Sequence, residues 1–96
     1  MRNSNRFYCA EIYCLNVRPI YDMYRAQANC IAKRLLKNQP VCANRLATSS
    51  MLKSLAKKLN QYCKQNNEPN CIESGDMISL AELVINEANE IIWELR

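Results

Sequence analysis

The sequence predicts an all-α protein, a compact domain of four to five helices in a bundle-like or orthogonal arrangement. Residues 20–37, 51–65 and 79–95 each repeat apolar side chains at the spacing of an amphipathic helix. Only residues 7–17, with aromatic and branched side chains, suit a strand, and a strand without a partner cannot satisfy its backbone hydrogen bonds. The 96 residues are expected to form a single domain, residues 1–96, around one modest core.

The N-terminal third is expected to contain two helices after a frayed end at residues 1–6. Residues 7–17 are expected to be helical, and this helix ends at Arg18. Pro19 suits the first turn of the next helix, because the N–H that proline lacks has no partner there. The helix over residues 20–37 should then end near Asn38, because the residue that precedes Pro40 avoids helical geometry.

The middle of the chain is expected to form a short helix, a break and a long helix. Residues 41–47 have the pattern of a short helix or of the start of a longer one. Thr48, Ser49 and Ser50 favour helix caps over helix interiors, so a break or bend is predicted there. A clean amphipathic helix follows over residues 51–65, and residues 66–78, which hold the only glycine, are expected to form a loop.

The C-terminal helix is the most strongly specified element. Ser79 and Glu82 have the S-x-x-E spacing of a capping box, which predicts that the helix begins there. Its core-facing side is expected to span an arc of about 140°. That side comprises Leu80, Ala81, Val84, Ile85, Ala88, Ile91, Ile92 and Leu95.

Charge is divided unevenly along the chain. Residues 1–67 hold twelve of the thirteen basic residues and two acids, a net charge of +10, whereas residues 68–96 hold seven acids and one arginine, a net charge of −6. Such asymmetry is typical of proteins that bind nucleic acid or a charged partner. It is equally compatible with an acidic helix that packs beside basic ones and neutralises them within the fold.

The residue types exclude most kinds of enzyme. There is no histidine, which removes the usual general base and imidazole metal ligands, and the single glycine cannot build a phosphate-binding loop. We therefore expect a protein that is not an enzyme, with no catalytic residue and no cofactor. The longest aliphatic run is three residues, so no membrane-spanning helix is expected.

The six cysteines allow two interpretations. Without a C-x-x-C pair a zinc site is not expected. The thiols are either free, with Cys63 as a small core residue, or joined in three bridges that staple a secreted effector or ligand carrier. Because the first residues lack the apolar segment of a secretory signal, free thiols and a cytoplasmic location are favoured; bridged cysteines would indicate a secreted or periplasmic protein.

The water-facing side of the C-terminal helix is the favoured binding surface. It carries two large apolar residues among acids, and aromatic anchors within a charged rim are typical of protein interfaces. We therefore expect a non-catalytic protein-binding module of the inhibitor, immunity or adaptor type, with a protein partner and a possible homodimer. Its predicted binding residues are Glu82, Leu83, Glu87, Glu90, Trp93 and Glu94.

A row of lysines supports an alternative function. Lys53, Lys57 and Lys64 project within about 40° of one another on the helix over residues 51–65. Such a row can follow a phosphate backbone, although lysines alone carry no base specificity. Nucleic-acid binding through these three residues is therefore the second hypothesis.

Overall fold

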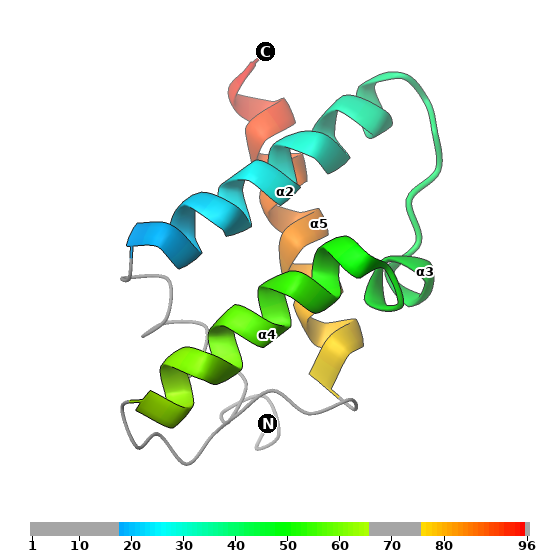
Figure 1. The fold of residues 1–96 in the computed structure, drawn as a ribbon. Coiled ribbons are helices and arrows are strands. Elements are labelled where there is room, and N and C mark those ends of the chain that lie inside the picture. Colours follow the sequence, from blue (N-terminus) through cyan, green and yellow to red (C-terminus); the bar gives the residue numbers. More distant parts are fainter. Residues whose placement is uncertain (1–17, 66–75, 96) are drawn as a thin grey trace.

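The computed structural model describes residues 18–65 and 76–95, and the predicted all-α class is confirmed for them. They form the helices α2 (Arg18–Leu36), α3 (Ala43–Ala47), α4 (Ser50–Gln65) and α5 (Met77–Glu94) (Figure 1). The predictions for a frayed end at residues 1–6, a helix at 7–17 and most of the loop at 66–78 fall on residues 1–17 and 66–75, outside the described residues.

Helix α2 begins two residues before the predicted start at Ile20, so Arg18 is its first residue rather than the end of a preceding helix, and it ends at Leu36, one residue before the predicted Lys37. Pro19 occupies the first turn of the helix. At the other end Asn38 adopts the left-handed conformation, with φ of 62°. The Gln39 N–H donates to the Arg34 carbonyl at 2.9 Å and the Asn38 N–H to the Leu35 carbonyl at 3.0 Å. These are the two hydrogen bonds of a Schellman motif, in which asparagine tolerates the left-handed position better than most residues.

The predicted break between α3 and α4 lies at Thr48 and Ser49. The Ser49 hydroxyl accepts a hydrogen bond from the Leu52 N–H at 3.1 Å and donates to the Leu46 carbonyl at 2.7 Å. One side chain thus caps the start of α4 and satisfies a carbonyl at the end of α3. The Thr48 hydroxyl donates to the Arg45 carbonyl at 2.9 Å, which supports the same turn.

The predicted start of α5 is wrong by two residues. The helix begins at Met77, with Asp76 at the N-cap, so Ser79 lies inside the first turn and the predicted loop does not extend to residue 78. Met77 is partly buried against the core. Burial of this side chain favours the earlier start. Removing an apolar side chain from water contributes more to the free energy of folding than the capping hydrogen bond that Ser79 would otherwise make.

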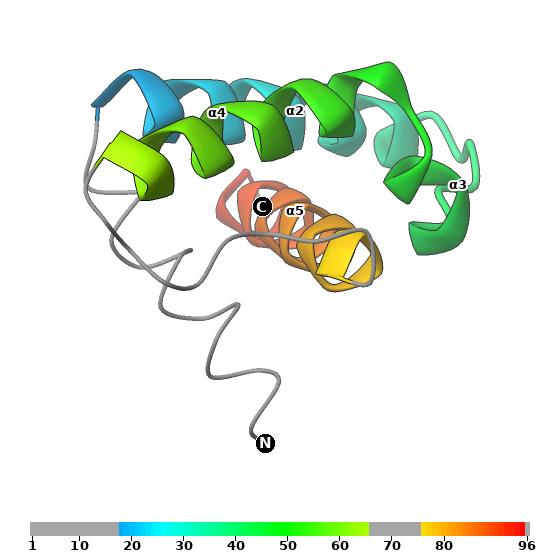
Figure 2. The ribbon, with the colours of Figure 1, turned by 60° about the horizontal axis from the view of Figure 1, so that its bottom comes forward.

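Helices α2 and α4 lie side by side and antiparallel, and α5 crosses one face of this pair (Figures 1 and 2). The short α3 sits at the end where α4 begins and packs against α5. The core between these layers is apolar. Its largest fully buried side chains are Ile31, Leu52, Leu55, Leu59, Cys63, Leu80 and Val84.

Three polar side chains of α2 fasten it to the other helices. The Tyr24 hydroxyl donates to the Leu83 carbonyl of α5 at 3.1 Å. The Arg25 guanidinium donates to the Glu87 carboxylate of the same helix. The Gln27 amide donates to the Met51 carbonyl of α4 at 2.6 Å. The position of α2 therefore decides which side of α5 remains in water.

Candidate functional site

The six residues predicted to form one binding face of α5 divide into two groups. Glu82, Glu90, Trp93 and Glu94 are exposed. Leu83 is partly buried and packs against the core. The exposed residues, together with Asn86 and Asn89, make up a continuous side of the helix that we call the α5 outer face; it comprises Glu82, Asn86, Asn89, Glu90, Trp93 and Glu94.

Glu87 belongs to the contact between α2 and α5. Its side chain is 24% exposed and its Arg25 partner 33%, so water screens this ion pair less than a surface pair. The hydrogen bond to Glu87 raises the pKa of the Arg25 guanidinium, against the opposing effect of partial desolvation. The charge of Glu87 is therefore used within the fold, and the α5 outer face carries three of the four predicted carboxylates.

The C-terminal end of α5 presents two large apolar side chains to water. Trp93 is 72% exposed and Leu95 is 70% exposed. Sequence periodicity placed Leu95 on the core-facing side, and the structure corrects this because Leu95 is the C-cap residue, where the helix has passed beyond the core. Leu95 thus leaves a second apolar side chain in water at this end of the helix, which the sequence pattern could not reveal.

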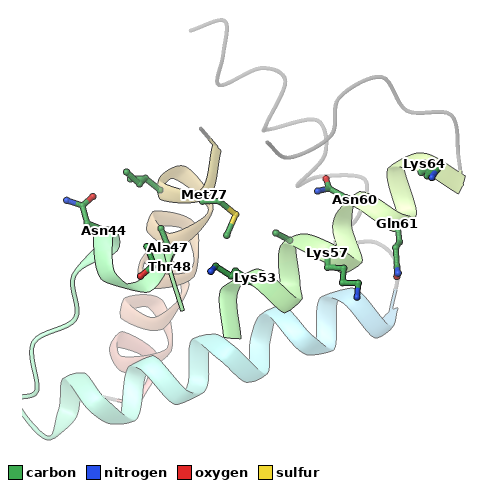
Figure 3. Close-up of a pocket in the computed structure, with 11 residues that line it drawn as sticks. Asn44, Ala47, Thr48, Lys53, Lys57, Asn60, Gln61, Lys64 and Met77 are labelled. Atoms are coloured by element: carbon green, nitrogen blue, oxygen red, sulfur yellow. The ribbon is translucent and has the colours of Figure 1, made fainter. Parts of the chain in front are cut away.

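The three predicted lysines line a single groove of about 780 Å³. We call it the α3–α4–α5 groove. In Figure 3, Lys53, Lys57 and Lys64 follow one another along α4, with Met77 of α5 and Ala47 of α3 across from Lys53. The remaining lining residues are Asn44, Thr48, Ala56, Asn60, Gln61 and Ile78.

This groove combines positive charge with apolar surface. Among the residues that the structure describes, none that lines the groove is acidic, so the three ammonium groups have no carboxylate partner within this lining. Ile78 is 45% exposed, and Met77 is partly buried beside it. The sequence pattern identified the lysines but missed Met77 and Ile78. These two residues lie on α5 and become part of the groove only because α5 packs beside α4.

The two surfaces lie far apart. Trp93 on the outer face lies fifteen positions along α5 from Ile78 in the groove. At about 1.5 Å per residue, that is roughly 22 Å along the helix axis. A partner side chain cannot touch both surfaces, so each is a separate candidate site.

The described cysteines take part in no disulfide bond. Cys63 is buried, as the sequence predicted, and Cys30 and Cys42 are exposed; Cys9, Cys14 and Cys71 lie outside the described residues. The backbone N–H groups of Arg45 and Asn44, at the first turn of α3, lower the pKa of the Cys42 thiol. Within the described ranges no three potential ligands gather into a metal site, and no helix is long and apolar enough to cross a bilayer.

Comparison with protein-family models, with curated proteins and with solved structures finds no match to this chain.

Proposed function

We propose that this protein is a non-catalytic protein-binding module, of the inhibitor, immunity or adaptor type, that captures a basic partner with the α5 outer face. The observation that carries the proposal is the 72% exposure of Trp93, the only tryptophan of the chain, on a side of α5 that bears three carboxylates. A large aromatic side chain left in water does not contribute to the core, and tryptophan is the residue type most enriched at the energetic centre of interfaces.

The charges around Trp93 specify the chemistry of the partner. Glu90 and Glu94 are exposed and lie within one turn of Trp93, and Glu82 continues the acidic surface toward the start of the helix. Lysine or arginine side chains on a partner would meet these carboxylates at the rim, while Trp93 enters an apolar recess. Electrostatic complementarity of this kind speeds association and selects the partner.

Replacing Trp93 with alanine tests the proposal. The tagged protein and its Trp93→Ala variant would be used to capture partners from cells that express the chain, with Leu36→Ala as the matched control. Leu36 is 52% exposed and lies on α2, which contributes no residue to the outer face. We expect Trp93→Ala to lose a partner that Leu36→Ala retains, while the helical circular dichroism of both is unchanged. Equal capture by all three proteins would refute the proposal.

A second candidate function is nucleic-acid binding by the α3–α4–α5 groove. The observation in its favour is that Lys53, Lys57 and Lys64 line one groove without an acidic neighbour in the lining. Affinity for DNA or RNA would then fall steeply with salt, and Lys53→Ala would lower the salt slope by about one. A filter-binding titration in which no DNA or RNA binds at low salt would remove this candidate.

A further inference from the structure

We infer that the α3–α4–α5 groove receives the C-terminal end of α5 from a second copy of this chain. The inference rests on the proposed function, because it names the partner that the α5 outer face captures. In this contact Trp93 of one copy inserts between α3 and α4 of the next, and Glu90 and Glu94 of the first copy approach the lysines of the second.

The charges and their spacing match. Lys53 and Lys57 are one turn apart on α4, and Glu90 and Glu94 are one turn apart on α5. Side chains four residues apart on a helix have Cβ atoms about 6 Å from each other, so two carboxylates can face two ammonium groups at the same time. No acidic residue in the groove lining competes for these lysines.

The apolar surfaces match as well. The groove has Ala47, Ala56, Met77 and Ile78 among its lining residues. A phosphate backbone would pair with the lysines but would leave Ile78, which is 45% exposed, without an apolar partner. The C-terminal end of α5 offers both kinds of surface: Glu90 and Glu94 supply the carboxylates, and Trp93, which is 72% exposed, supplies the apolar surface. An acidic helix end with an aromatic anchor therefore fits the groove better than a nucleic acid does.

The size of the groove allows the contact, and the length of α5 requires that it form between two copies of the chain. The groove of about 780 Å³ has room for an indole ring. The roughly 22 Å of helix between Ile78 and Trp93 prevents the C-terminal end of α5 from reaching the groove of its own chain. The contact joins two different surfaces, so association is head to tail and grows into a ring or an open chain.

Sedimentation velocity on the full chain, from micromolar to millimolar concentration, tests the inference with two variants. Lys53→Glu damages the groove and keeps the outer face, whereas Trp93→Ala damages the outer face and keeps the groove. The matched controls are Lys58→Glu, an exposed charge reversal on the same helix outside the groove lining, and Leu36→Ala on α2. Circular dichroism establishes that each variant remains folded.

The inference predicts a different degree of association for each protein and for the mixture of the two variants. The unmodified chain and both controls should associate as concentration rises, while each damaging variant should weaken association at least about tenfold. An equal mixture of the Lys53→Glu and Trp93→Ala proteins retains one intact face and one intact groove. This mixture should form a one-to-one dimer, at twice the 11.1 kDa chain mass, and nothing larger.

Three results would overturn the inference: a chain that stays monomeric at every concentration, a control that weakens association as much as its test variant, or a mixture that forms no dimer. The proposed function is judged separately. Capture of another protein that requires Trp93 but tolerates Lys53→Glu would uphold protein binding while excluding self-docking, and capture that tolerates Trp93→Ala would exclude the proposed function itself.

Discussion

Truncating Trp93 to alanine should cost little stability, and the expected loss follows from its exposure. The side chain is 72% exposed, so about a quarter of its roughly 250 Å² is covered by the fold. At about 25 cal/mol per Å², the covered surface contributes about 1.5 kcal/mol. The β-carbon of alanine keeps part of that contact, and the unfolded chain covers some of it too, so we expect a loss of about 1 kcal/mol.

A core leucine provides the comparison. Leu55 of α4 has no exposed surface, and Leu55→Ala should cost about 2 to 5 kcal/mol because it leaves a cavity. Both variants would be unfolded in urea and by heat while helicity is followed by circular dichroism. In a domain of this size 1 kcal/mol corresponds to about 4 to 8 °C in Tm, so the two variants are easily separated.

The result that refutes this reasoning is a Trp93→Ala variant as unstable as Leu55→Ala. A loss of about 3 kcal/mol or more would mean that the indole is enclosed in solution, since only buried aromatic side chains carry that cost. Trp93 would then be a core residue, and the α5 outer face would lose its anchor.

Three further predictions concern contacts inside the fold. Glu87→Gln should lower the free energy of unfolding by about 1 kcal/mol, a loss that shrinks at high salt, because the partly buried ion pair with Arg25 is removed. Gln27→Met should change it by less than about 1 kcal/mol in urea unfolding, since the loss of the hydrogen bond from the Gln27 amide to the Met51 carbonyl offsets the removal of the buried Oε1, which has no hydrogen-bond partner among the described residues. Iodoacetamide should modify Cys42 at a lower pH than a free thiol peptide, because its lowered pKa gives more thiolate at each pH, whereas the buried Cys63 should react only on unfolding. Peptide mass mapping against pH would check this order.

Local features of the sequence were sufficient to place the helices. The positions of α2 and α4 and the break at Thr48 and Ser49 agree with the periodicity and the capping residues, because these signals act between residues a few positions apart. The start of α5 was missed for the opposite reason. Met77 packs against a core made by other helices, and that burial outweighs the nearby capping pattern of Ser79.

The candidate sites show the same division. Periodicity identified the lysine row of α4 and the acidic side of α5, since residues on one helix keep a fixed angular relation. It could not separate Glu87, which pairs with Arg25, from Glu90, which remains in water. That difference depends on which side of α5 is covered by α2, a contact between residues more than sixty positions apart.

The sequence by itself determined an all-α domain, the faces of its helices and the uneven charge along the chain, because these properties depend on neighbouring residues. Only the tertiary structure decided that Trp93 and Leu95 project beyond the core and that Met77 and Ile78 join three lysines in one groove. Those arrangements arise where helices from distant parts of the chain meet, and the free energy of packing them depends on surfaces that no single segment contains.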